Sequence, residues 1–261
     1  ELLERPVELN IWRAPTDNDR HIRLQWERAG YDRTATRASR VYSTRSAGQE
    51  GTVALHADIS LAADALQPAL DVHAVWTVTG SGELAVSLRA HMSAGFPSLP
   101  RFGLRLFLPQ AMQEVSYYGL GPRESYIDKR RSCRHGEFRT TVAELHEGCI
   151  RPQEGGSRAD CDYVTLSDGD LGLTAVGLRP FSFNASAYTQ EELTRCAHDV
   201  ELTRCGSTVL CLDGAMAGIG SASCGPELRP EYRVDDEALG LDLVLLPTLS
   251  SPIPTQHNEV N

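Results

Sequence analysis

Apolar and polar side chains alternate along several stretches of this chain, and this pattern constrains its fold more than any other feature. From Val53 to Leu61, every second residue is apolar and the residues between are small or polar. Successive side chains of a β-strand point to opposite faces, so this pattern is typical of a strand with one buried face. It recurs over residues 70–78, 84–90 and 102–108, with turn-rich segments such as TGSGE in between. These stretches are predicted to be consecutive antiparallel strands.

The rest of the chain is also predicted to be rich in strands. Runs at 164–169, 171–178, 208–214 and 238–247 are β-branched or Leu-rich and are bounded by Gly, Asp or Pro. Helical signals lie only around Trp26 and at Thr189, where TQEE has the pattern of a capping box. We therefore predict an all-β fold, one large antiparallel sandwich over residues 7–252, with a linker at 1–6 and a tail at 253–261.

Charge and cysteine usage exclude several classes of partner. The net charge of -10 would repel a polyphosphate backbone, so nucleic acid is not an expected partner. The apolar stretches are too short to span a bilayer, and nothing at the first residues resembles a secretion signal. Seven cysteines form no CxxC pair and eight histidines form no HExxH motif, so neither a bound metal nor a disulfide framework is expected. These features predict a protein of the reducing cytoplasm.

Two segments carry groups suited to binding a sugar. The Gly/Ser-rich segment from Gly218 to Gly225 lacks the last glycine of a dinucleotide loop, but its small residues would let a sugar approach the backbone closely; a tight loop without ligand is the alternative. The segment RAPTDND, from Arg13 to Asp19, is rich in hydrogen-bonding groups, which would either bind a polyol or pin a turn. The 35 acidic residues alone identify no catalytic pair.

Four segments in order resemble the small-chain domain of bacterial β-galactosidases, which belong to glycoside hydrolase family 2. They are NIWRAPTDND at 10–19, YYGLGPRESYIDK at 117–129, PFSFNASAYTQEEL at 180–193 and MAGIGSASCGPELRPEY at 216–232. The resemblance implies a galactose mutarotase-like supersandwich packed against the catalytic barrel of the same enzyme. It also implies that the catalytic glutamates and the magnesium and sodium ligands lie in other domains. This chain would then contain no catalytic residue, bind no cofactor, and belong to a homo-oligomeric parent that hydrolyses β-galactosides such as lactose.

The resemblance also assigns candidate residues around the galactose pocket. Cys224 matches the position of a tryptophan that forms an apolar platform in well-known family members, and Ser221 and Ser223 share its loop. Arg13, Asp17, Asn18 and Asp19 are expected to line the rim or anchor a loop there. Two other functions stay open: a free-standing sugar epimerase of the mutarotase type, which needs a histidine acid and a carboxylate base in one cleft, and a carbohydrate-binding module.

Overall fold

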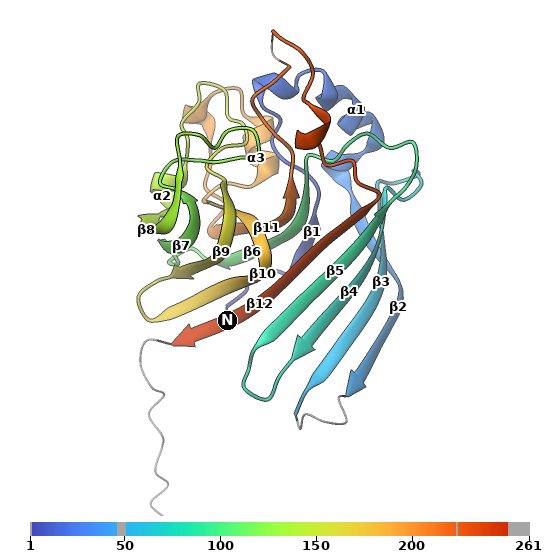
Figure 1. Cartoon of the computed structure of the whole chain (residues 1–261), viewed down its shortest axis with the longest axis vertical. Helices are drawn as coiled ribbons and strands as arrows, with labels where there is room; N and C mark the ends of the chain where they lie inside the picture. Colours follow the sequence, from blue (N-terminus) through green and yellow to red (C-terminus); the bar gives the residue numbers. More distant parts are fainter. Residues whose placement is uncertain (1, 46–50, 223, 250–261) are drawn as a thin grey trace, which may run out of the picture.

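The computed structural model describes residues 2–45, 51–222 and 224–249. Within this part, twelve strands form one connected antiparallel sheet, which confirms the predicted all-β fold (Figure 1). The strands are β1 (Glu8–Asn10), β2 (Ala35–Arg45), β3 (Val53–Ala62), β4 (Leu70–Val78), β5 (Leu84–Met92), β6 (Arg101–Pro109), β7 (Glu114–Gly121), β8 (Arg134–Thr141), β9 (Arg158–Ser167), β10 (Leu171–Ser186), β11 (Ser207–Met216) and β12 (Ala238–Leu249).

The strand order explains how distant segments meet. The sheet runs β1-β6-β11-β10-β12-β5-β4-β3-β2, and β9 branches from β10 to pair with β7, which pairs with β8. Figure 1 shows β12 between the meander β2–β5 on one side and the layer of β6, β11, β10 and β9 on the other. Strand β11 therefore lies beside β6, although about a hundred residues of chain separate them.

Short helices connect the strands. They are α1 (Ile22–Ala29), α2 (Val142–Leu145) and α3 (Gln190–Arg195), with 3-10 turns η1 (Asp17–Asp19), η2 (Tyr31–Arg33), η3 (Asp199–Glu201) and η4 (Pro230–Tyr232). The helix predicted around Trp26 is α1, and Thr189 caps α3 by accepting a hydrogen bond from the Glu192 amide. The reciprocal half of that capping box is replaced, because the Glu192 carboxylate accepts from the Thr203 amide and from Arg195.

One continuous core joins the two halves of the sheet. It is built from the buried faces of the strands together with Trp12 and Trp26, whose rings meet edge to face at 6.2 Å. The alternation at β3 is confirmed only in its second half: Leu61 is buried, but Val53 and Leu55 are exposed because no other described segment covers that end of the meander. The predicted tail at 253–261 lies outside the described residues.

Three further features concern the cysteines, the groups that could bind a metal and the length of the helices. All seven cysteines are free thiols, and in the described ranges no group of three His, Cys, Asp or Glu side chains has the arrangement needed to hold a metal ion. No helix in the described part of the chain is long and apolar enough to cross a membrane.

Candidate functional site

A buried ion pair organises the RAPTDND segment. Arg13 is 1% exposed, and its guanidinium donates to both carboxylate oxygens of Asp19, at 3.1 and 2.7 Å. Asp19 also accepts from the Thr16 amide at 2.9 Å, which closes the turn η1. The Arg13 guanidinium lies over the Trp26 ring of α1, 5.4 Å from its centroid. This pair therefore pins the turn against α1. Of the two alternatives for this segment, binding a polyol or pinning a turn, these contacts correspond to the second.

The same segment reaches across to the loop that follows β11. Arg13 donates to the carbonyl oxygens of Ala217, at 2.7 Å, and of Gly218, at 3.0 Å. The Asn18 amide donates to the Ile219 carbonyl oxygen. Arg13 and Asn18 are thus brought together with the Gly/Ser-rich loop. Asp17 is exposed, and its backbone amide donates to the Gln153 side chain at 2.9 Å.

We name residues 217–229 the rim loop. Its carbonyl oxygens are held by Arg13 and Asn18, and it folds back on itself where the Ala222 amide donates to the Pro226 carbonyl oxygen at 3.1 Å. Cys224 is exposed within this fold-back, and Ser221 lines a pocket of about 330 Å³ between the rim loop and α1. Ser223 lies outside the described residues. In Figure 1 the orange-red rim loop lies at the top of the molecule beside α1.

Asp128, which was not predicted from the sequence, also holds the rim loop. The Asp128 carboxylate accepts hydrogen bonds from the Ile219 amide, at 3.0 Å, and from the Gly220 amide, at 2.7 Å. Asp128 lies inside the YYGLGPRESYIDK segment, so the segment's place in the resemblance was its only signal. The rim loop is therefore held through its carbonyl oxygens by Arg13 and Asn18 and through two of its amides by Asp128.

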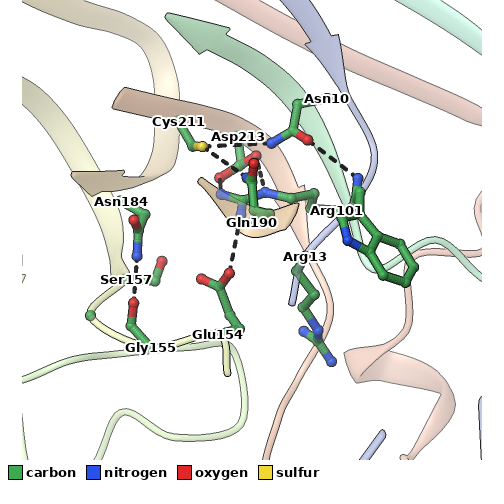
Figure 2. A network of polar contacts seen from close by, with 12 residues as sticks. Asn10, Arg13, Arg101, Glu154, Gly155, Ser157, Asn184, Gln190, Cys211 and Asp213 are labelled. Carbon is green, nitrogen blue, oxygen red and sulfur yellow. Dashed lines mark hydrogen bonds and ion pairs between the residues drawn. The ribbon is translucent and has the colours of Figure 1, made fainter. Parts of the chain in front are cut away.

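A second polar network lies deeper, at the junction of β6 and β11. Figure 2 shows the Arg101 side chain between the carboxylates of Asp213 and Glu154. The guanidinium donates to Asp213 at 2.9 and 2.5 Å and to Glu154 at 3.3 Å, and all three side chains are buried. Burial raises the pKa of the Glu154 carboxyl above its ordinary value, against the opposing effect of Arg101.

The surroundings of this network make it a structural feature. Asn10 and Gln190 both donate to the Cys211 sulfur, at 3.6 and 3.2 Å (Figure 2). Burial raises the pKa of the Cys211 thiol to about 11, so the thiol stays protonated and is no nucleophile. The adjacent cavity measures about 20 Å³, enough for about one water molecule and far too small for a sugar. The two carboxylates are therefore not placed to flank a glycosidic bond.

The network also supports the segment that carries Arg13. The Glu154 amide donates to the Ala14 carbonyl oxygen at 2.9 Å, and the neighbouring Gln153 side chain accepts from the Asp17 amide. Arg101 holds Glu154, and Glu154 in turn binds the backbone next to Arg13. Neither Arg101, Asp213 nor Glu154 was identified from the sequence.

A histidine–carboxylate pair bears on the epimerase alternative. His73 and Asp58 lie on the outer face of the meander, about half exposed, in an open pocket of about 470 Å³. Their side chains bind each other directly, His73 Nδ1 to Asp58 Oδ1 at 2.7 Å. An acid and a base for epimerisation must act on a sugar placed between them, so this pair does not favour that alternative.

Comparison with known proteins identifies the family. Residues 1–245 match the family model described as "Beta galactosidase small chain". The chain belongs to the β-galactosidase small-chain family. It is 40% identical over 233 residues to a β-galactosidase of Actinobacillus pleuropneumoniae and 40% identical over 227 residues to one of Staphylococcus xylosus. These matches cover 89% and 87% of this small chain but only 22% of each relative, so the chain spans about a fifth of their length.

A search of solved structures returns aldose epimerases. An aldose epimerase homologue from C. elegans is 10% identical, with a TM-score of 0.36, over 81% of the small chain and 69% of that protein. The sequence resemblance had implied a likeness to this class. A score of this size carries no conclusion about a shared function.

Proposed function

We propose that this small chain completes the galactose site of a retaining exo-β-galactosidase of glycoside hydrolase family 2. In this proposal, the parent enzyme hydrolyses terminal β-galactosides such as lactose. Its catalytic barrel supplies the two glutamates, and the small chain supplies the rim loop. The parent is proposed to be a cytoplasmic homo-oligomer. The observation that carries the proposal is the rim loop itself, which is fixed at its base by Arg13, Asn18 and Asp128 and exposes Cys224.

The chemistry of the rim loop suits a sugar. A hexose presents hydroxyl groups at its edge and C–H groups on its faces, so a site needs both polar donors and an apolar contact. Cys224 offers a small polarisable group for the C–H face, in place of an aromatic platform. Ser221, and Ser223 in the same loop, offer hydroxyl groups beside it. A thiol provides far less contact area than an indole, so we propose that this parent relies less on stacking at the rim.

The contacts of the buried acidic residues support placing the catalytic carboxylates in another domain of the parent. A retaining glycosidase needs two carboxyl groups about 5–5.5 Å apart on either side of the scissile bond. The buried carboxylates of Asp19, Asp213 and Glu154 instead bind arginines inside the protein. We therefore assign both catalytic carboxylates to another domain of the parent.

The same reasoning applies to the magnesium and sodium ions. Hard cations of this kind need several oxygen ligands converging on one point. The described residues contain no cluster of three acidic, histidine or cysteine side chains that would hold a metal ion, so this part of the chain does not supply such a site. We propose that both ions bind elsewhere in the parent.

Two experiments test the proposal. The isolated chain, assayed on a nitrophenyl β-galactoside, is expected to show no turnover, and turnover by a pure preparation would contradict the assignment of the catalytic groups. In the intact parent, Cys224→Trp is expected to change KM for the same substrate without changing the thermal stability. Cys205→Ala serves as the control, since that half-buried thiol donates to the Ser207 carbonyl oxygen. Wild-type kinetics in Cys224→Trp would show that the rim loop does not touch the sugar.

A further inference from the structure

The rim loop has little apolar packing in its exposed middle. Ala217 and Gly218 are buried and Leu228 packs against the core, but between them the described residues pass over the pocket of about 330 Å³ that separates the loop from α1. Loop residues Gly218, Ser221, Ala222 and Leu228 line this pocket on one side, and Trp26 and Phe96 line it on the other. A segment without close packing takes its position from hydrogen bonds, so the anchors of the loop decide where Cys224 lies.

Asp128 is the anchor placed nearest to the exposed part of the loop. Its two carboxylate oxygens accept from two consecutive amides, Ile219 at 3.0 Å and Gly220 at 2.7 Å. A carboxylate that receives two amide donors in this way fixes both the distance and the orientation of the peptide between them. Arg13 and Asn18 bind only carbonyl oxygens of the same stretch. The Ala217 and Gly218 amides donate to the backbone carbonyl oxygens of Pro100 and Tyr232, so Asp128 is the partner of the next two amides, those of Ile219 and Gly220.

Asp128 is itself held on a rigid turn. Tyr126 and Lys129 exchange two backbone hydrogen bonds, of 3.0 and 3.1 Å, which place Asp128 inside a closed four-residue turn. Tyr126 is fully buried, and its hydroxyl accepts from the Ser157 amide at 3.4 Å. The preceding residue, Ser125, is also buried and bonds to the Ser157 backbone. Asp128 thus projects from the core rather than from a free loop.

The contact is close enough to exclude a side chain. A methyl group added at Gly218 would lie 2.5 Å from an Asp128 oxygen and 2.9 Å from Leu228. One added at Gly220 would lie 3.2 Å from the same carboxylate oxygen. Glycine at these two positions lets the loop backbone approach Asp128 within hydrogen-bonding distance.

We propose that Asp128 is a positioning residue for galactoside binding, acting through the rim loop that carries Cys224. The inference rests on the proposed function of that loop, and it adds a residue about 90 positions away in the chain. Asp128 touches loop amides rather than substrate, so it affects the sugar only by fixing the loop.

The test uses the intact parent enzyme. Asp128→Asn keeps the size of the side chain but turns one acceptor into a donor facing an amide. Losing one charge-assisted hydrogen bond is expected to raise KM for a nitrophenyl β-galactoside by about tenfold, with a much smaller change in kcat. Asp170→Asn, in the exposed turn between β9 and β10, is the matched control and is expected to keep the wild-type KM.

A double variant separates this inference from the proposed function. If Asp128 acts through the loop, Asp128→Asn combined with Cys224→Ala raises KM less than the product of the two single effects. A normal KM in Asp128→Asn, together with an altered KM in Cys224→Ala, would overturn the inference and leave the proposed function intact. Normal KM values in both would overturn both.

A second variant covers the case in which Asp128→Asn does not fold. Gly220→Ala strains the same contact from the loop side, because the added methyl group would lie 3.2 Å from the Asp128 carboxylate and one of the two must shift by a few tenths of an ångström. It is expected to raise KM in the same direction, and an unchanged KM would overturn the inference.

Discussion

Replacing Arg101 by methionine is expected to destabilise the chain far more than replacing a surface arginine. The Arg101 guanidinium is almost fully buried and binds both oxygens of Asp213 and one oxygen of Glu154. Methionine has a similar length but no charge, so Arg101→Met leaves two buried carboxylates without their cation. Removing one partner of a buried ion pair in this way costs about 3–5 kcal/mol of unfolding free energy.

The control is the ion pair of Arg89 with Asp242, whose atoms are 2.8 Å apart while the Arg89 side chain is 56% exposed. A surface pair of this kind contributes about 0–1 kcal/mol, so Arg89→Met is expected to lose little. Urea unfolding of both variants at pH 7 measures the two losses, provided that the slope with denaturant is unchanged. A loss for Arg101→Met no larger than that of the control would refute the reasoning.

The Arg101→Met variant also has an expected pH dependence. Without the cation, the pKa values of Glu154 and Asp213 rise further in the folded chain, whereas in the unfolded chain they stay ordinary. The folded chain then binds more protons than the unfolded chain above pH 5, so stability falls as the pH rises. The slope is at most about 1.4 kcal/mol per pH unit for each carboxyl. The deficit relative to wild type should therefore shrink as the pH is lowered from 7 towards 5.

Three further substitutions test other contacts by urea unfolding. Trp26→Ala removes a buried ring whose Nε1 donates to the Ser98 carbonyl oxygen at 2.7 Å, and is expected to cost about 3–5 kcal/mol; a loss under about 1 kcal/mol would contradict its place in the core. Thr189→Ala removes the cap of α3 and is expected to cost about 1 kcal/mol of unfolding free energy. An unchanged unfolding free energy would show that the cap does not form in solution. Burial raises the pKa of Glu154, so its contribution to stability falls as the pH rises from 4.5 upwards, and Glu154→Gln is expected to remove that fall; an unchanged pH profile would contradict it.

Strands with one buried face gave the clearest signal in the sequence. The alternation at β4 and β5 marks them, because burial on one side selects apolar residues at every second position, whereas β6 is buried on both faces. Strand β2 gave no such signal, since nearly all of its residues are exposed and it forms by backbone pairing with β3. Its arginines, such as Arg37 and Arg40, are typical of an edge strand that is protected from further pairing.

The site was predicted only where its contacts are local. The pair of Arg13 and Asp19 spans six residues, so a turn rich in charged and amide groups indicated it. The contact of Asp128 with the Gly220 amide spans 92 positions and joins a side chain to the backbone. Backbone partners have no residue type, so such a contact leaves no pattern in the sequence. The pairing of Arg101 with Asp213 across β6 and β11 was hidden for a related reason, because it depends on strand order.

The hydrogen bonds by which Arg13, Asn18 and Asp128 hold the rim loop are all made to its main-chain atoms. Arg13 and Asn18 hold carbonyl oxygens of residues 217–219, and Asp128 holds the amides of residues 219 and 220. Among the side chains that the structure describes from Ser221 to Glu227, none takes part in these bonds, so substitutions there alter what the loop presents and leave these bonds in place. The attachment of the loop is therefore independent of the side chains that it exposes. If the rim loop has the proposed function, libraries randomised at these positions offer a route to a changed sugar preference in the parent enzyme.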